Sequence, residues 1–303
     1  MGKILAVKRF GVIFILSNLL FSLVAGCQPA FQPGTYTDDM GREVNISNVP
    51  ERIVSYGSSI TEILFALGLG EKVVGVDDFS DYPEAVKSKP KVGDAFSPSI
   101  ERLVGLEPDL VLTVKQEQLN TALDNLGVKF MVIDPTDIDG IYKNIELIGE
   151  ITGVEGKASK LIDDMKKTTA RVQSQVKSAP EIRVIFLIDT ADLNNPWTGG
   201  HGSFIDALIT MAGGENIAAE APAPWVQFSI EQIISADPEI IILPNKYVAS
   251  PQALKDHPAW QRTSAVRNNR IIIINGDLIN RPGPRLVQGL DELAKIIHPE
   301  LYK

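Results

Sequence analysis

Residues 99–113 read SIERLVGLEPDLVLT, and residues 229–243 read SIEQIISADPEIIIL. Both stretches begin with Ser-Ile-Glu and carry a proline nine positions after the serine, followed by an acidic residue and an apolar run. Serine is a favoured helix N-cap, so each stretch predicts a short helix followed by a buried strand. A second pair, SITEILFALGLGE at 59–71 and SFIDALITMAGGE at 203–215, precedes the first pair in each half. We therefore expect two lobes of related architecture.

The rest of the chain alternates short apolar runs with helical patterns. Strands are expected at 52–56, 72–76, 109–113 and 128–133, and again at 183–188, 216–219, 239–243 and 270–275; helices are expected at 60–67, 99–106, 116–126, 203–212, 229–236 and 284–298. Continuous apolar strands alternating with helices are typical of parallel sheets covered on both faces. The pattern predicts an α/β fold with two Rossmann-like lobes built on parallel sheets.

One long helical pattern separates the two halves. Between Glu155 and Lys177 the apolar residues recur mostly at spacings of three, four and seven, and neither Gly nor Pro follows Gly156. Such a helix would be roughly 30–35 Å long at 1.5 Å per residue, so it would join the lobes rigidly. A β-hairpin is expected around Met40 and Gly41. The expected divisions are a signal peptide at 1–26, a lipidated linker with the hairpin at 27–51, the first lobe at 52–153, the inter-lobe helix at 154–178 and the second lobe at 179–303.

The first residues have the pattern of an export signal. Lys3, Lys8 and Arg9 precede an apolar run at 11–26, which ends in small residues directly before Cys27. The sequence VAGC at this point resembles the lipobox of bacterial lipoproteins. This resemblance implies cleavage before Cys27 and attachment of lipid to that residue, which would hold the protein at a membrane surface.

Composition limits the class of protein and its partners. The chain has 303 residues, of which 44% are hydrophobic and 22% charged, and its formal net charge is −9. Without the first 26 residues, which carry three positive charges and no negative charge, 277 residues with a net charge of −12 would remain. An acidic chain is a poor match for nucleic acid, because phosphates attract Lys and Arg. With a single cysteine, no disulfide can form within one chain.

Several motifs together resemble a known family. In chain order they are the lipobox, TYTDDMGREV, RIVSYGSSITEILFALGLGEKVVGV, the first SIE stretch, the long helix, GGHGSFIDALITMAGGENIAAE, the second SIE stretch and RPGPRLVQGLDELAKIIHP. This order is similar to that of the periplasmic binding proteins that deliver cobalamin, siderophores and haem to ABC importers, and closest to the cobalamin binders. The resemblance covers nearly the whole chain after the lipobox. It implies two α/β lobes joined by one rigid helix, a ligand in the cleft between them, and a site of action in the periplasm or on the outer face of the cytoplasmic membrane.

The same resemblance suggests why the SIE stretch occurs twice. An acidic residue in the first turn of a helix is favoured by the helix dipole, and this alone would account for either glutamate. In the family, however, a glutamate of each lobe docks on an arginine of the permease dimer, which works with ATPase subunits. Glu101 and Glu231 match these positions, so the resemblance implies that they dock the chain on such a permease.

The expected ligand is a corrinoid such as cobalamin. A flat macrocycle with apolar edges and amide arms suits a wide cleft with aromatic walls and few charges. Phe79, Trp197, Trp225 and Arg281 fall near ligand-contacting positions of the cobalamin binders by motif match, but Val114 stands where those proteins carry a tryptophan. The full set of expected ligand-binding residues is Tyr56, Phe79, Phe96, Trp197, Trp225 and Arg281.

Other ligands and other functions remain open at this point. A ferric siderophore is often anionic and would call for several Arg or Lys residues, of which Arg281 is the clearest candidate. Haem would need an axial ligand, for which Tyr56 or His201 could serve. No metal site is expected, because the three histidines all lie in the second half. A two-domain α/β enzyme is the alternative of a different functional class. We expect no enzyme activity and no cofactor, because the chain has no P-loop, GxSxG or HExxH motif and its GLGEKV stretch follows a helix and precedes a strand.

Overall fold

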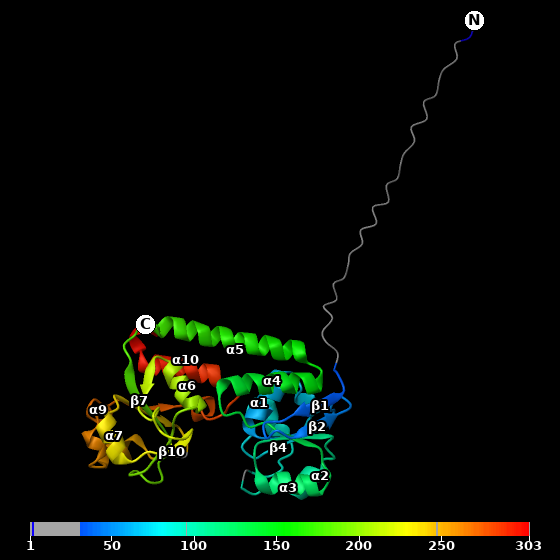
Figure 1. Ribbon diagram of the computed structural model, residues 1–303, viewed down its shortest axis with the longest axis horizontal. Helices are drawn as coiled ribbons and strands as arrows, with labels where there is room; N and C mark the ends of the chain where they lie inside the picture. The colour runs from blue at the N-terminus through cyan, green and yellow to red at the C-terminus, as the bar shows by residue number, and fades with distance from the viewer. Residues whose placement is uncertain (1, 3–30, 95, 247, 303) are drawn as a thin grey trace.

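The computed structural model describes residues 2, 31–94, 96–246 and 248–302, so the expected signal peptide and Cys27 lie outside the described residues. Two lobes lie side by side, each built around its own β-sheet, and the long helix α5 (Glu155–Val176) runs along both of them (Figure 1). The predicted α/β fold with two lobes joined by a long helix is confirmed. In the part of the chain that the structure covers, no helix is long and apolar enough to cross a membrane.

The sheet of the first lobe contains four parallel strands in the order β4-β3-β5-β6. These strands are β3 (Ile53–Tyr56), β4 (Val73–Val76), β5 (Leu110–Thr113) and β6 (Phe130–Val132). Every residue of β3, β5 and β6 is buried, which explains the continuous apolar runs in the sequence. An antiparallel hairpin of β1 (Gly34–Thr37) and β2 (Glu43–Ile46) lies beside this sheet, as the sequence predicts.

The helices of the first lobe are α1 (Ser58–Ala66), α2 (Ile100–Gly105), α3 (Glu117–Asn125) and α4 (Ile138–Thr152). Helix α4 was not predicted. It begins where the Asp137 carboxylate accepts a hydrogen bond from the Gly140 amide, and it ends at Gly153, whose φ of 70° is a left-handed conformation that glycine adopts readily. Short 3-10 turns in the molecule lie at Gly70–Lys72, Glu84–Ser88, Trp260–Arg262, Gly276–Leu278 and Pro299–Tyr302.

The second lobe repeats the strand order of the first and adds an antiparallel pair. Its strands are β7 (Ile182–Asp189), β8 (Trp197–Gly199), β9 (Gly214–Asn216), β10 (Trp225–Gln227), β11 (Ile240–Pro244) and β12 (Ile271–Ile274). The parallel order β9-β7-β11-β12 matches β4-β3-β5-β6, in agreement with the doubled sequence stretches. However, β8 pairs antiparallel with β7, and β10 pairs antiparallel with β8. The second lobe therefore has the predicted parallel sheet of four strands, to which β8 and β10 add an antiparallel edge that the sequence analysis did not predict.

The predicted strand at 216–219 is wrong beyond its first residue. Strand β9 ends at Asn216 because the side chain of that residue turns the chain. Its amide group donates to the Gly199 carbonyl and to the Asp206 carboxylate, and its side-chain oxygen accepts from the Ala218 amide. The Ile217 amide still donates to the Val184 carbonyl of β7, and the chain then leaves the sheet in a turn at residues 217–220.

The helices of the second lobe are α6 (Phe204–Met211), α7 (Ile230–Ala236), α8 (Pro251–Asp256), α9 (Ser264–Arg267) and α10 (Leu286–Ile297). Helix α7 begins with a capping box, in which the Ser229 hydroxyl accepts from the Gln232 amide and the Gln232 side chain accepts from the Ser229 amide. The equivalent Ser99 at the start of α2 makes no such side-chain cap. The two SIE stretches thus start equivalent helices with different local contacts.

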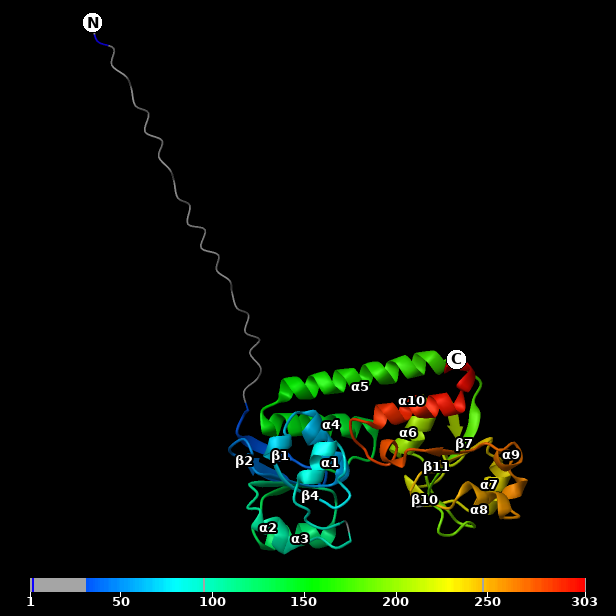
Figure 2. The same cartoon turned by 180° about the vertical axis from the view of Figure 1, so that it is seen from behind.

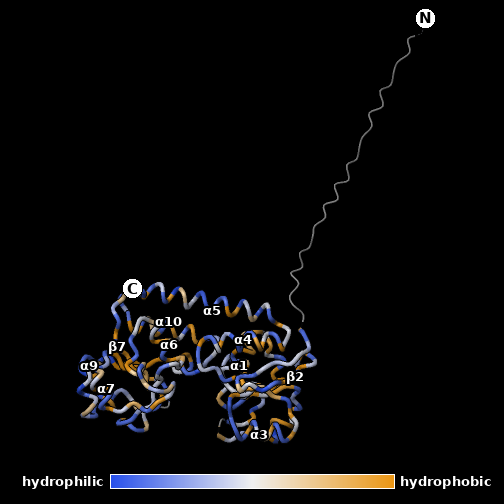
Figure 3. Tube along the Cα trace, in the orientation of Figure 1, coloured by the Kyte–Doolittle hydropathy of each residue, from blue (hydrophilic) through white to orange (hydrophobic). Residues whose placement is uncertain are grey.

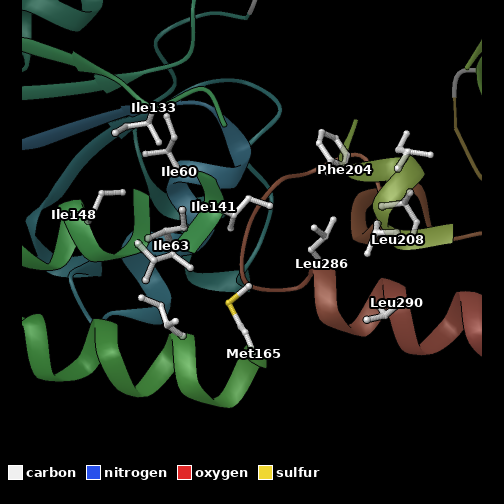
Figure 4. Packing of buried hydrophobic residues seen from close by; sticks show 14 of the residues in the cluster. Ile60, Ile63, Ile133, Ile141, Ile148, Met165, Phe204, Leu208, Leu286 and Leu290 are labelled. Atoms are coloured by element: carbon white, nitrogen blue, oxygen red, sulfur yellow. The ribbon is translucent and has the colours of Figure 1, made fainter. Parts of the chain in front are cut away.

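Helix α5 holds the lobes together through a shared apolar core. It packs on α4 of the first lobe and on α10 and α6 of the second. Its buried residues, among them Met165 and Val172, belong to one apolar cluster that also contains Ile141 of α4 and Leu286 of α10. Met165 lies between the side chains of the two lobes (Figure 4). The outer side of α5 is hydrophilic, and the strands inside each lobe are hydrophobic (Figure 3). Relative motion of the lobes would therefore have to disturb a continuous packed core.

Candidate functional site

A cleft lies between the two lobes. Its main cavity has a volume of about 570 Å³. Val114 and Asp134 line it from the first lobe, and Phe204, Trp225 and Arg281 line it from the second. A neighbouring cavity of about 370 Å³ shares Arg281 with it and continues along the boundary between the lobes. Volumes of this size are usual for small-molecule sites.

Trp225 forms an aromatic wall of the cleft. Strand β10 carries this residue, and its pairing with β8 fixes the position of the ring above α6. The ring contacts Phe204 edge-on, with 5.1 Å between the ring centroids, yet 40% of Trp225 remains exposed. An exposed tryptophan held by a neighbouring ring presents a rigid apolar surface to a ligand. Trp197 is similarly exposed, but it lines a separate cavity of about 470 Å³ on the second lobe, whose other side is formed by Trp225.

Phe79 lies at the edge of the cleft on a loop that Asp77 organises. The buried Asp77 carboxylate accepts hydrogen bonds from the Gly57 amide at 3.0 Å, the Phe79 amide at 2.9 Å and the Ser80 hydroxyl at 2.5 Å. Burial raises the pKa of Asp77 even though these hydrogen bonds act in the opposite direction. Phe79 itself is 42% exposed and lines the 370 Å³ cavity. The loop thus displays an aromatic ring above a buried polar anchor.

Arg281, the expected cation of the cleft, is surrounded by carboxylates. Its guanidinium donates to Glu62 at 3.1 Å and to Asp81 at 2.8 Å, and it forms an ion pair with Asp277 at 3.1 Å. Only 12% of its side chain is exposed. Burial would lower the pKa of Arg281, but hydrogen bonding to Asp81 and the neighbouring negative charges raise it overall. The positive charge of Arg281 is therefore already balanced by carboxylates of the protein in the ligand-free structure.

Arg281 belongs to a larger group of charges that we call the inter-lobe ion network. Arg285 donates to the two oxygens of Glu62 at 2.8 and 2.6 Å, and its guanidinium lies 3.9 Å from the centre of the Tyr82 ring. Lys246 contacts Asp277 at 3.1 Å. The network comprises Glu62 and Asp81 of the first lobe and Lys246, Asp277, Arg281 and Arg285 of the second. Of these six residues the sequence analysis named only Arg281, because no local pattern indicates ion pairs between residues that are up to 223 positions apart.

The structure does not place Tyr56 where a ligand could touch it. This residue is 1% exposed and lies in the apolar core of the first lobe, where its hydroxyl donates to the Asp94 carbonyl. Burial, followed by nearby carboxylates, raises its pKa. The expectation that Tyr56 contacts ligand, or serves as an axial ligand for haem, conflicts with this position. Phe96 is 84% exposed, and neither it nor His201 lines the cleft.

Glu101 and Glu231 are both exposed in the first turns of α2 and α7. In two opposite views, both helices lie on the side of the molecule that faces away from α5 (Figures 1 and 2). Neither glutamate is ion-paired with another residue of the described ranges. Two free carboxylates, one on each lobe, therefore lie on the same side of the molecule.

A metal-binding cluster is not found in residues 2, 31–94, 96–246 and 248–302. No group of three or more His, Cys, Asp or Glu side chains in these ranges is placed to hold an ion. The cleft between the lobes and the acidic residues on α2 and α7 are the features on which a function can be argued.

Comparison with known proteins identifies similar chains. Residues 53–278 match the family model for “periplasmic binding protein”. The chain is 34% identical to the “uncharacterized ABC transporter substrate-binding lipoprotein YvrC” of Bacillus subtilis (strain 168), with 98% of this chain and 99% of the relative covered. It is 28% identical to the “vitamin B12-binding protein” of Vibrio parahaemolyticus, with 83% and 91% covered.

A solved structure extends this similarity to the fold. The “periplasmic heme-binding protein RhuT” from Roseiflexus sp. RS-1, in its apo form, superposes with a TM-score of 0.74 at 29% sequence identity. The match covers 83% of this chain and 99% of that protein. The similar proteins are named for different ligands, vitamin B12 in one case and heme in the other.

Proposed function

This chain belongs to the family of periplasmic binding proteins and is a substrate-binding protein of an ABC importer, and we propose that its ligand is a corrinoid such as cobalamin. It is not an enzyme, and it works outside the cytoplasm with a permease and a small-molecule ligand. The observation that carries the proposal is a cleft with aromatic surface from Trp225, Phe204 and Phe79, in which the charge of Arg281 is already matched by carboxylates.

The charge balance of the cleft favours a corrinoid over a ferric siderophore. Cyanocobalamin carries no net charge, and its affinity can come from burial of the ring edges against aromatic side chains together with hydrogen bonds to the amide arms. An anionic iron complex needs unpaired cations. Three cations line the two cavities: Arg281 and Lys246 form ion pairs with carboxylates, and Lys115 acts electrostatically on the nearby Asp134 carboxyl. The relative named as a vitamin B12-binding protein supports the same ligand class.

Haem is the second candidate, because the similar structure from Roseiflexus is named as a heme-binding protein. Haem iron in proteins is held by an axial side chain such as His, Tyr or Met. Of the two axial ligands expected from the sequence, Tyr56 is buried in the core and His201 does not line the cleft. This arrangement supports the corrinoid over haem.

Tryptophan fluorescence can test the ligand directly. Trp197 and Trp225 are exposed, whereas Trp260 is fully buried and its indole donates to the Leu193 carbonyl, so Trp260 supplies a constant background. We expect saturable quenching by cyanocobalamin, but not by a ferric catecholate siderophore or by haem at the same concentrations. Trp225→Phe should remove most of the signal change and Trp197→Phe less of it. Equilibrium dialysis with the same three compounds controls for light absorption by the ligands. Saturation by an iron complex without binding of cyanocobalamin would contradict the proposal.

We also infer that Glu101 and Glu231 dock the two lobes on arginines of a permease dimer. Exposed carboxylates on the same side of the molecule support this role, because charge-assisted pairs with arginine orient a complex as well as stabilise it. Attachment of lipid at Cys27 would keep the protein close to that permease, and mass spectrometry of the mature protein tests this attachment.

A further inference from the structure

The inter-lobe ion network contains equal numbers of positive and negative charges. Glu62, Asp81 and Asp277 supply three negative charges, and Lys246, Arg281 and Arg285 supply three positive ones. The network crosses the boundary between the lobes, since Glu62 and Asp81 come from the first lobe and the other members from the second. Four of the six residues belong to the cleft itself, because Asp81, Lys246, Asp277 and Arg281 line the 370 Å³ cavity.

The six residues divide into an inner and an outer part. Glu62 is buried, with 2% of its side chain exposed, and it accepts hydrogen bonds from both arginines. Asp81 and Asp277 are more accessible, at 46% and 23%. They contact Arg281 from the side of the cleft, and both also contact Lys246. The pair of Glu62 and Arg285 connects the lobes, whereas Asp81 and Asp277 cover Arg281 and Lys246 on the side of the cleft.

We propose that Asp81 and Asp277 are specificity-determining residues, which neutralise Arg281 and Lys246 and so make the cleft select uncharged ligands over anionic ones. This inference rests on the proposed function, because it concerns what the cleft binds. An anionic ligand would have to displace the carboxylates from Arg281 or lie next to them. Either event costs free energy, because a like charge is brought close or a paired cation is left without its partner. A neutral ligand meets a network without net charge and avoids this cost.

The proposal predicts that removal of the two carboxylates opens the cleft to anions. In Asp81→Asn/Asp277→Asn the network would hold Glu62 against three cations, so its net charge would change from zero to +2. Both positions are partly accessible, so the substitutions leave the buried pair of Glu62 and Arg285 in place. We expect the affinity for an anionic ferric tris-catecholate complex to rise about tenfold, which corresponds to roughly 1.4 kcal/mol.

A matched control distinguishes the loss of the ion pairs with Arg281 and Lys246 from the loss of negative charge in the cleft as a whole. Asp78 and Asp134 also line the cleft cavities, and neither is paired with Arg281 or Lys246. Asp78→Asn/Asp134→Asn removes the same two negative charges without uncovering these cations. We expect the control to change the affinity for the ferric complex by no more than about threefold, because the solvent and its ions screen charges that do not contact the ligand directly. Adding Arg281→Gln to the Asp81/Asp277 variant should remove most of the increase in affinity for the ferric complex.

The measurement is a set of titrations of the purified full chain and its variants with the ferric tris-catecholate complex, with cyanocobalamin measured on the same samples. A gain confined to the Asp81/Asp277 variant, and lost with Arg281→Gln, supports the proposal. An equal gain in the control, or no gain in either variant, overturns it. The proposed function is judged separately on the wild type: if the wild type binds the ferric complex and not cyanocobalamin, the corrinoid proposal fails. The difference between variant and control still decides the role of the two carboxylates.

Discussion

Replacement of Glu62 tests whether the inter-lobe ion network contributes to stability. In Glu62→Gln the side chain keeps its length and one oxygen acceptor but loses its charge. Arg281 retains Asp81 and Asp277 as partners, whereas Arg285 loses its only ion-pair partner among the described residues. Since 13% of the Arg285 side chain is exposed, water can solvate the unpaired guanidinium only in part. The substitution should therefore destabilise the fold.

The expected size follows from the contacts. Removing one member of a buried ion pair typically costs about 3–5 kcal/mol, because the remaining charge stays desolvated. Glutamine still accepts one hydrogen bond, so we expect the low end, about 3 kcal/mol. In a chain of this size each kcal/mol lowers the melting temperature by about 2–4 °C, which gives a decrease of roughly 6–12 °C.

Differential scanning calorimetry of the ligand-free protein measures this decrease. Asp164→Asn is the matched control, because Asp164 pairs with Lys160 on the exposed side of α5 and its loss should leave the melting temperature unchanged. Arg285→Gln combined with Glu62→Gln should cost less than the sum of the two single substitutions, since the residues are in direct contact. A decrease in Glu62→Gln no larger than that in Asp164→Asn, or additive effects of the two substitutions, would refute the reasoning.

Three further outcomes are expected. Trp225→Ala should weaken binding of cyanocobalamin by about 2 kcal/mol, or roughly 30-fold, because the exposed ring and its contact with Phe204 are lost. Equilibrium dialysis measures this affinity. An unchanged affinity would show that Trp225 does not contact the ligand. Glu101→Ala/Glu231→Ala should abolish stimulation of ATP hydrolysis by the reconstituted transporter while ligand affinity is retained, and Glu107→Ala/Glu239→Ala is a control with the same loss of charge. For Asp81, burial raises the pKa, but the hydrogen bond and charge of Arg281 outweigh it, so the pKa lies below the ordinary value of 3.8. A lowered carboxyl pKa stabilises the fold fully at pH values above the pKa of the unfolded state, and this stabilisation is lost as the pH falls through the pKa of the folded state. The difference in unfolding free energy between wild type and Asp81→Asn should therefore stay constant from pH 5 to 8 and shrink only below about pH 4. Urea unfolding at each pH measures this difference.

Most regular elements could be predicted from the sequence because their signals are local. The strands predicted at 52–56 and 239–243 form at Ile53–Tyr56 and Ile240–Pro244, and every residue in them is buried. Helix α5 shows its buried stripe as spacings of three, four and seven. The three-residue strands β8 and β10 could not be predicted in this way. Each is too short to show periodicity, and their antiparallel pairing depends on the position of β7.

The candidate site could be predicted only in part. Trp225, Phe79 and Arg281 were expected at the cleft and do line its cavities. Tyr56 was expected there because it follows the first strand, but the direction of its side chain at the end of β3 takes the ring into the core. The position of a residue at the end of a strand does not determine which face of the sheet its side chain lies on when both faces are covered.

The sequence by itself determined the two-lobed α/β architecture, the long connecting helix and the acidic first turns of α2 and α7, because each depends on residues close together in the chain. Only the tertiary structure decided which charges meet in the cleft. Glu62 and Arg285 are separated by 223 positions, and their pairing exists only because α5 and the shared apolar core hold α1 against the loop before α10. The net charge that a ligand meets is a sum over such distant partners, so no local pattern in the sequence can reveal it.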